Sequence, residues 1–172
     1  MEPRIEKFNL ELDKFFLRKA NEAARRSVEK GNCPFGAVLA DNEGNLLIEQ
    51  ENLQVITRDK SAHAEVSLVR NVTPKFSADF LWNCTIYTNA EPCLMCAGAI
   101  YWANIGRIVY AVDESRLIEL EVYSDDVYTS TSCRVVFEND KKDVVIVGPI
   151  SDPELEKNMV EVFSSYDWGK YY

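Results

Sequence analysis

The sequence predicts an α/β domain in which helices cover both faces of a single sheet. The first observation is a set of short apolar segments typical of buried strands: PFGAVLA at 34–40, CTIYT at 84–88 and RIVYAV at 107–112. The second is that segments with helical spacing lie between them, and such alternation favours a layered α/β arrangement. We expect residues 1–172 to form a single domain, because this length can bury a core and no linker or repeat divides it.

The first 70 residues predict a helix, a hairpin and a second, short helix. Small and apolar residues recur at helical spacing over roughly residues 10–30, namely Leu12, Phe16, Ala20, Ala23 and Ser27. Gly31-Asn32 ends this helix. After the strand PFGAVLA, the turn DNEGN leads into the returning strand LLIEQ. A short helix over Ala62–Val69 then carries His63 and Glu65.

The remaining residues predict three helices and four strands. The strand CTIYT precedes Pro92, which we place at the first position of the helix CLMCAGAIYWA. The strand RIVYAV is followed by a short helical stretch near ESRLIEL. CRVVF and DVVIV are interpreted as two strands around the polar turn NDKK. Asp152 as N-cap and Pro153 in the first turn begin the last helix, before the aromatic tail YDWGKYY.

Composition and charge indicate which cellular compartment and which classes of binding partner to expect. The net charge of −9 disfavours nucleic acid as the main partner, since phosphate binding needs a basic surface. No apolar run approaches the roughly 20 residues of a membrane span, so we expect no membrane association. The first ten residues, MEPRIEKFNL, lack the apolar core of a secretory signal. We therefore expect a cytoplasmic protein.

Two of the five cysteines have metal-site spacing. An odd number of cysteines in a cytosolic chain argues against a disulfide framework. Cys93 and Cys96 form a CxxC that suits a redox site, a structural zinc site or a catalytic zinc site. Residues three apart share one helix face, and the start of a helix favours thiolates. No second CxxC completes a four-ligand site, and His63, the only histidine, is the strongest third ligand. Three protein ligands and an open position are typical of a catalytic zinc.

Glu65 gains a role from this arrangement. The combination of H-x-E with P-C-x-x-C is the signature of zinc deaminases, in which the glutamate carries protons and does not bind the metal. Glu65, His63, Pro92, Cys93 and Cys96 occur in that order. Taken alone, Glu65 would be explained as a charge favouring its helix N-terminus, and His63 as a core or cap histidine. Together they predict a zinc-dependent hydrolase.

At these motifs the sequence resembles the cytidine deaminase superfamily. The similarity runs from about Pro34 to Asp113 and is carried by PFGAVLA, AHAEV and EPCLMCAGAIYWA. The resemblance implies a three-layer α/β/α sandwich around a mostly parallel five-stranded sheet. It also implies zinc-dependent hydrolytic removal of an exocyclic amine, with release of ammonia.

Within that superfamily, GAIYWA is most similar to the bacterial-type guanine deaminases, whereas tRNA adenosine deaminases share AHAEV and CAGAI. The guanine branch implies a small nucleobase substrate and a homodimer, in which the C-terminal helix and tail, about 152–172, can be exchanged between subunits. The resemblance places substrate contacts at Asn52, Phe35, Trp102, Ala62 and Tyr172 (or Tyr171). Core packing is the alternative for Phe35 and Trp102, and docking on its own domain is the alternative for the tail.

The aspartate that hydrogen-bonds to the base in the guanine branch has a less clear counterpart in this sequence. The guanine branch has Phe-Asp-Asp after its short helix, where this chain has VYSDD, so Asp126 or Asp125 fits that role only if the loop shifts. Asn89-Ala90 before Glu91 is a second departure. Guanine presents N1–H and its 2-amino group on one edge, and an ionised aspartate can accept from both, whereas adenine lacks that donor pair. The sequence therefore predicts conversion of guanine to xanthine.

Three alternatives remain open at this point. A tRNA adenosine deaminase would need a basic groove, but the paired basic residues Arg25-Arg26 and Lys141-Lys142 suit solvated surfaces. Another aminated heterocycle, such as cytosine, guanosine or an aminotriazine, would leave the chemistry unchanged. A non-catalytic zinc module would need a fourth protein ligand; none is adjacent to the motifs, so Cys84 or an aspartate would have to supply it.

Overall fold

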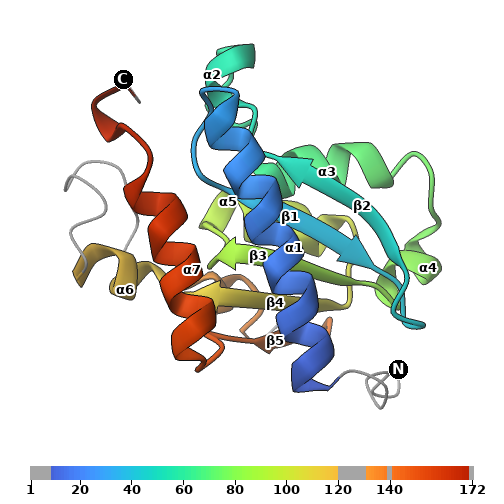
Figure 1. Cartoon of the computed structure of the whole chain (residues 1–172). Coiled ribbons are helices and arrows are strands. Elements are labelled where there is room, and N and C mark those ends of the chain that lie inside the picture. The colour runs from blue at the N-terminus through green and yellow to red at the C-terminus, as the bar shows by residue number, and fades with distance from the viewer. Residues whose placement is uncertain (1–8, 120–130, 139–140, 171–172) are drawn as a thin grey trace.

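The computed structural model describes residues 9–119, 131–138 and 141–170, and these form one five-stranded sheet with helices on both faces (Figure 1). The strand order is β2-β1-β3-β4-β5. The strands are β1 (Gly36–Ala40), β2 (Leu46–Glu51), β3 (Thr85–Ala90), β4 (Arg107–Val112) and β5 (Val145–Val147). β1, β3 and β4 are buried along their whole length, as expected for strands covered on both faces.

The sheet is mixed, which corrects the expectation of a mostly parallel one. β1 pairs antiparallel with β2 on one side and with β3 on the other. β3, β4 and β5 pair in parallel. β1 is therefore the reversed strand, because the short DNEGN turn can join only antiparallel neighbours, whereas helices connect the parallel strands.

The helices form the two outer layers predicted for this fold. Figure 1 shows α1 and α7 lying across one face of the sheet, with α3 and α5 behind it. Phe16 and Leu17 of α1 and Phe163 of α7 belong to one buried cluster, whereas Leu68 of α3 and Ile100 of α5 belong to the other. The α-helices are α1 (Leu10–Glu29), α2 (Gln54–Thr57), α3 (Ala64–Val72), α4 (Ala78–Trp82), α5 (Leu94–Trp102), α6 (Glu114–Glu119) and α7 (Pro153–Ser164).

Several local predictions need correction. CRVVF is not a strand: Cys133–Val136 form the 3-10 helix η1, and both Cys133 and the C-cap residue Phe137 are buried. His63 and Cys93 are the N-caps of α3 and α5, so Pro92 precedes its helix instead of occupying the first turn. The N-cap role predicted for Asp152 is confirmed, because its side chain accepts a hydrogen bond from the Leu155 amide. In the described part of the chain, no helix is long and apolar enough to cross a bilayer.

A buried ion pair joins α1 to β4 of the sheet. Arg107 of β4 donates two hydrogen bonds of 2.7 Å to the Asp13 carboxylate of α1. The Tyr87 hydroxyl donates a third, at 3.0 Å. The side chains of Asp13 and Arg107 are only 5% and 6% exposed.

Asp13→Ala should therefore destabilise the fold strongly, because the Arg107 charge stays buried without its carboxylate. We expect the free energy of unfolding, measured in urea, to fall by about 3–5 kcal/mol. Glu22→Ala is the matched control, since Glu22 is half exposed on the same helix and should change stability little. A loss below about 1 kcal/mol for Asp13→Ala would show that the pair does not contribute in this way.

Candidate metal centre

Two helix starts bring together one imidazole and two sulfurs. His63 and Cys93 are the N-caps of α3 and α5, and neither side chain caps its own helix, so both are available to other partners. Cys96 lies in the first turns of α5 and is fully buried. The His63 Nδ1 atom is 3.7 Å from the Cys93 sulfur and 3.5 Å from the Cys96 sulfur. Residues 30 and 33 positions apart in the sequence thus meet at one point.

These atoms fit a zinc ion. In a tetrahedral site with the usual zinc–sulfur and zinc–nitrogen bond lengths, sulfur and nitrogen ligands lie about 3.6 Å apart. The three ligand atoms here lie within 4.8 Å of one another. Within residues 9–119, 131–138 and 141–170, no fourth His, Cys, Asp or Glu joins this group. Cys84, the alternative fourth ligand, instead contacts the Phe80 carbonyl oxygen at 3.4 Å. Three protein ligands suit a catalytic zinc better than a structural one.

The pKa values of the two cysteines favour the binding of a cation. A hydrogen bond from Cys96, together with His63, outweighs burial and lowers the pKa of Cys93 to about 4. The pKa of Cys96 is raised well above its usual value, first because its proton is held by Cys93 and second because it is buried. The pair therefore carries one thiolate and one thiol at neutral pH. A soft divalent ion can displace the remaining proton, as thiolates are the form that binds zinc.

Glu65 lies against the metal ligands but is not part of the group. It sits in the first turn of α3, is 7% exposed, and its Oε2 atom accepts from the Cys96 sulfur at 3.4 Å. Burial raises the pKa of Glu65. Burial lowers the pKa of His63, but the hydrogen bond with Cys93 and the charge of Glu65 reverse this, so the net pKa is raised. A carboxyl group with a raised pKa beside metal ligands suits proton transfer near neutral pH.

Asn52 and Ala62 lie on the segments that frame this centre. The Asn52 amide is fully buried and is engaged with Gln54, accepting from its backbone N–H at 2.9 Å and donating to its side chain at 2.7 Å. The Ala62 carbonyl accepts from the Leu53 N–H at 3.0 Å. This hydrogen bond holds the segment that follows Asn52 against the segment that leads into His63, because Ala62 directly precedes His63.

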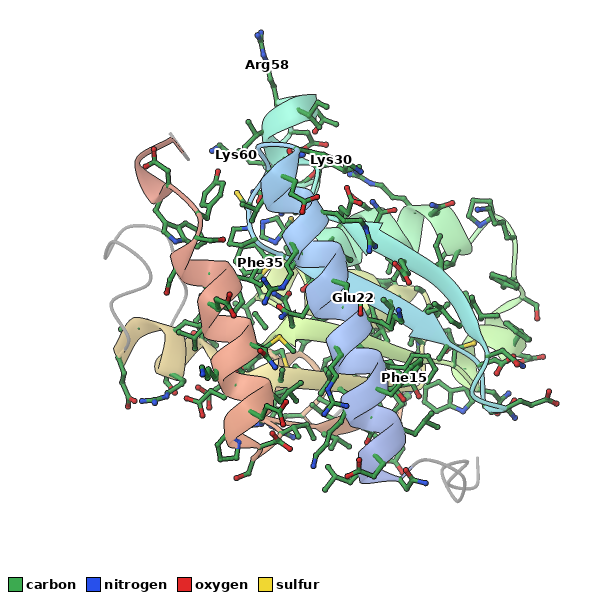
Figure 2. The ribbon with its side chains drawn as sticks, viewed as in Figure 1. Phe15, Glu22, Lys30, Phe35, Arg58 and Lys60 are labelled. Carbon is green, nitrogen blue, oxygen red and sulfur yellow. The ribbon has the colours of Figure 1, made fainter. Side chains whose placement is uncertain are left out.

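The two predicted aromatic contacts have different environments. Phe35 is half-buried between α1 and α7 (Figure 2), with its ring 5.6 Å from that of Phe163 and 6.2 Å from that of Trp168. Trp168 belongs to the C-terminal 3-10 helix η2 (Trp168–Lys170), so the tail contacts its own domain here. Trp102 is 82% exposed at the far end of α5, about 9 Å along the helix axis from Cys96. Its role as a substrate contact stays a prediction.

The other predicted contacts fall outside the described residues. Asp125 and Asp126 belong to 120–130, and Tyr171 and Tyr172 end the chain. Their roles stay predictions.

Two residues near the centre were missed by the sequence reasoning. Asn89, at the carboxyl end of β3, is buried, accepts from the Gly36 N–H and donates to the Pro34 carbonyl, each at 3.0 Å. It thereby fixes the loop that carries Phe35. Glu114, on the first turn of α6, lines a cavity and is close enough for its charge to act on Cys93, Glu65 and His63. The only sequence signal was position: Asn89 directly follows the predicted strand CTIYT, and Glu114 comes two residues after RIVYAV.

Comparison with known proteins supports the reading of these motifs. Residues 10–112 match the family described as the cytidine and deoxycytidylate deaminase zinc-binding region. The chain is 38% identical over 108 residues to the tRNA-specific adenosine deaminase of Haemophilus influenzae. The aligned residues cover 63% of this chain and 62% of that protein. The chain is also 38% identical over 105 residues to the guanine deaminase of Bacillus subtilis, covering 60% of this chain and 67% of that protein.

A solved structure bears out the fold. The guanine deaminase from Nitrosomonas europaea superposes with a TM-score of 0.70 over 95% of this chain and 88% of that one, at 20% identity. At that identity the likeness concerns the fold alone. The match to the H. influenzae relative spans less than two thirds of its length.

Proposed function

Because this chain belongs to the family of cytidine and deoxycytidylate deaminase zinc-binding regions, we propose that it removes an exocyclic amine from a free purine base, converting guanine and water into xanthine and ammonia. The observation that carries the proposal is the meeting of His63, Cys93 and Cys96 with the carboxyl group of Glu65 beside them. His63, Cys93 and Cys96 would hold zinc. When bound there, zinc supplies a water that loses its proton near neutral pH.

Glu65 moves the protons of the reaction. It accepts a proton from the attacking water while a carbon–oxygen bond forms at the ring carbon that bears the amine, and the π pair of the adjacent ring C=N bond moves onto the ring nitrogen. It then gives that proton to the amine nitrogen; the carbon–nitrogen bond to the amine breaks, ammonia leaves, and the pair on the ring nitrogen forms the C=N bond again. The raised pKa of Glu65 suits both steps, since the group must accept a proton and release it within one turnover.

A small nucleobase is favoured over tRNA by charge. The net charge is −9, and three acidic residues, Glu91, Asp113 and Glu114, line a cavity where β3 and β4 end. Carboxylates accept hydrogen bonds from the N1–H and amino donors of guanine, whereas they repel the phosphates of a polynucleotide.

Ammonia release across a panel of bases tests the substrate. We expect the zinc-loaded enzyme to deaminate guanine with a kcat/KM at least about 100-fold above those for adenine and cytosine, because a site built for paired donors rejects rings that lack them. Guanosine keeps both donors, so its rate tests whether the site admits a ribose on the base. The identity to the H. influenzae tRNA-specific adenosine deaminase makes tRNA the second candidate, so an adenosine-containing tRNA belongs in the panel. Turnover of that tRNA but not of guanine would replace the substrate and leave the chemistry in place.

We also propose a cytoplasmic homodimer formed through α5. This helix, LMCAGAIYW, is apolar or small on all sides, yet Leu94, Met95 and Trp102 are 38%, 40% and 82% exposed. A helix that is apolar all round is normally covered. α7 packs on its own chain, and its exchange between subunits stays a prediction. The free cysteines among the described residues suit a reducing compartment.

Sedimentation tests the dimer. The wild-type chain should have twice its monomer mass at micromolar concentration, and Trp102→Glu should shift it to the monomer, since a charge would be buried in the interface. Phe15→Glu is the control, because Phe15 is exposed on α1, across the sheet (Figure 2). A monomeric wild-type chain would contradict this assembly.

A further inference from the structure

The segment that leads into His63 is held partly from outside. Residues 58–62, here called the His63 loop, join α2 to α3 without forming a helix or a strand, and His63 itself is the N-cap of α3. Backbone groups of such a loop need hydrogen-bond partners, and some of these come from the residues that follow β2. The Leu53 N–H is one, donating to the Ala62 carbonyl at 3.0 Å. The position of His63 therefore depends on the residues after β2.

Gln54 supplies two further contacts to the His63 loop. Its carbonyl accepts from the Asp59 N–H at 3.2 Å, and its side-chain Nε2 atom donates to the Lys60 carbonyl at 3.1 Å. The other end of the same amide, Oε1, accepts from Asn52 Nδ2 at 2.7 Å, and the Gln54 N–H donates to Asn52 Oδ1 at 2.9 Å. Gln54 is only 3% exposed, whereas glutamine usually lies on the surface. One buried side chain thus connects Asn52 to the His63 loop.

The two side-chain amides can adopt only one orientation. The Lys60 carbonyl can only accept, so Gln54 must turn Nε2 toward it and Oε1 toward Asn52. The Gln54 N–H can only donate, so Asn52 must turn Oδ1 toward it and Nδ2 toward the Gln54 side chain. Turning either amide over would place two donors or two acceptors against each other in a buried site. The connection between Asn52 and the His63 loop therefore has a single arrangement.

Asn52 is in turn anchored to the core. Its N–H donates to the Phe35 carbonyl at 3.0 Å, and its carbonyl accepts from the hydroxyl of Ser27, a fully buried residue of α1, at 3.2 Å. The contacts therefore run from α1 through Asn52 and Gln54 to the His63 loop. A buried polar network of this kind holds one conformation, because a bond left unmade there costs more than it would in water.

We propose that Gln54 is a positioning residue of the metal centre: by fixing the His63 loop, it holds the His63 imidazole where it meets Cys93 and Cys96. The His63 Nδ1 atom is 3.7 Å and 3.5 Å from the two sulfurs. Ligands that are in place before an ion arrives bind it more tightly, since less ordering accompanies binding. This inference rests on the zinc centre of the proposed function, and it holds whichever base is the substrate.

Zinc affinity tests the inference. Methionine is about as long as glutamine and suits a buried site, but it cannot donate to the Lys60 carbonyl. We expect Gln54→Met to weaken zinc binding about 10- to 100-fold, measured by competition with a chelator of known affinity, because a group that orients a metal ligand is lost. The visible absorption of cobalt bound in place of zinc should also change, since it reports the geometry of the ligands. A residue that only stabilises the fold would lower the melting temperature of the zinc-free protein and change neither quantity.

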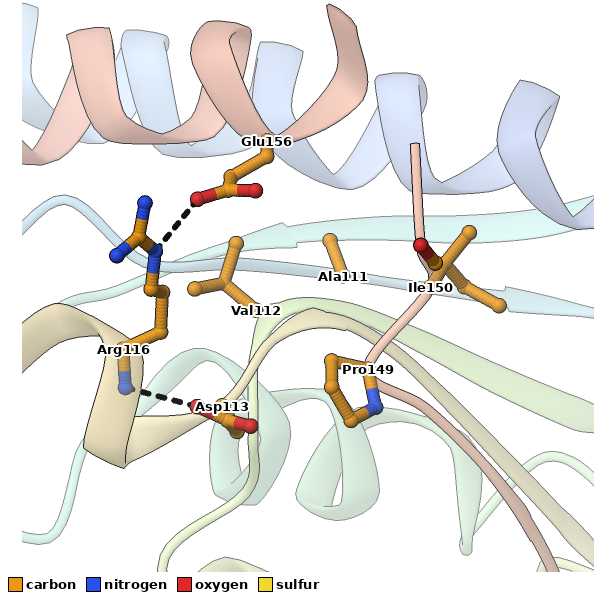
Figure 3. Close-up of a pocket in the computed structure, with 8 residues that line it drawn as sticks. Ala111, Val112, Asp113, Arg116, Pro149, Ile150 and Glu156 are labelled. Carbon is orange, nitrogen blue, oxygen red and sulfur yellow. Dashed lines mark hydrogen bonds and ion pairs between the residues drawn. The ribbon is translucent and has the colours of Figure 1, made fainter. Parts of the chain in front are cut away.

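Two controls separate positioning from a general loss of contacts. Gln50→Met makes the same change on β2, where the Gln50 side chain donates to the neighbouring Glu51 carbonyl at 3.0 Å. Glu156→Gln weakens the tertiary contact shown in Figure 3, in which Arg116 of α6 donates to Glu156 of α7 at 2.6 Å. Both variants should bind zinc within about threefold of wild type, since neither contact involves the His63 loop.

The outcomes decide the role of Gln54 separately from the substrate. A Gln54→Met protein that binds zinc within about threefold of wild type, with an unchanged cobalt spectrum, would overturn the inference. If that variant does not fold, Gln54→Asn decides on the same criterion: it keeps a polar amide but is shorter by a methylene, and should lose about tenfold in zinc affinity. A wild-type enzyme that releases no ammonia from guanine would refute the substrate and leave this inference standing, whereas a wild-type chain that binds no zinc would refute both.

Discussion

Glu65→Gln should abolish ammonia release while the protein keeps its zinc. A glutamine of the same shape fills the buried site beside Cys96 but neither accepts a proton from water nor delivers one to the departing amine. General acid–base catalysis contributes about 10²–10⁴-fold per step, and Glu65 serves two steps, so we expect kcat to fall by at least about 10³-fold. Ammonia release measures the activity, and elemental analysis of the same sample measures the zinc content.

Glu43→Gln is the control for this substitution, because Glu43 is exposed in the DNEGN turn and makes the same charge change far from the centre. A Glu65→Gln enzyme within tenfold of the wild-type rate would remove Glu65 from proton transfer. Loss of both zinc and activity would instead assign Glu65 to metal retention.

Cys93→Ala should remove the metal and, with it, all turnover. Cys93 supplies the sulfur with the lowered pKa, and two remaining ligands hold zinc far more weakly than three. We expect the zinc content to fall from about one ion per chain to near zero, with no detectable ammonia release.

Cys84→Ala is the matched control and also tests the non-catalytic alternative. Cys84 is also buried, with 1% of its surface exposed, but its sulfur contacts the Phe80 carbonyl oxygen and is not one of the three grouped ligands. The variant should keep its zinc. A Cys93→Ala protein with full zinc content would show that the metal is bound elsewhere.

The metal centre was predictable because its residues sit at helix starts that the sequence marks clearly. His63 and Glu65 are separated by one residue, and Cys93 and Cys96 by two, so each pair is nearly fixed by local geometry. What joins the pairs is the packing of α3 against α5 on one face of the sheet, and the zinc deaminase signature supplied that information.

Other features depended on tertiary contacts that no local pattern records. CRVVF has strand propensity, yet Ser132 caps a 3-10 helix there and Glu91 binds the N–H of Cys133. The direction of β1 follows from a hairpin on one side and pairing with β3 on the other. Glu114 lacks any motif of its own and became noticeable only in the structure, where it lines a cavity and the charges of Glu65 and Cys93 act on it.

The presence of one imidazole in the whole chain, with Nδ1 facing both sulfurs, has a practical consequence. Protein labelled with nitrogen-15 only at histidine would give the magnetic resonance signals of His63 and nothing else. Loading of the ion, its removal by a chelator and the arrival of a base could each be followed at the reacting centre without any assignment work.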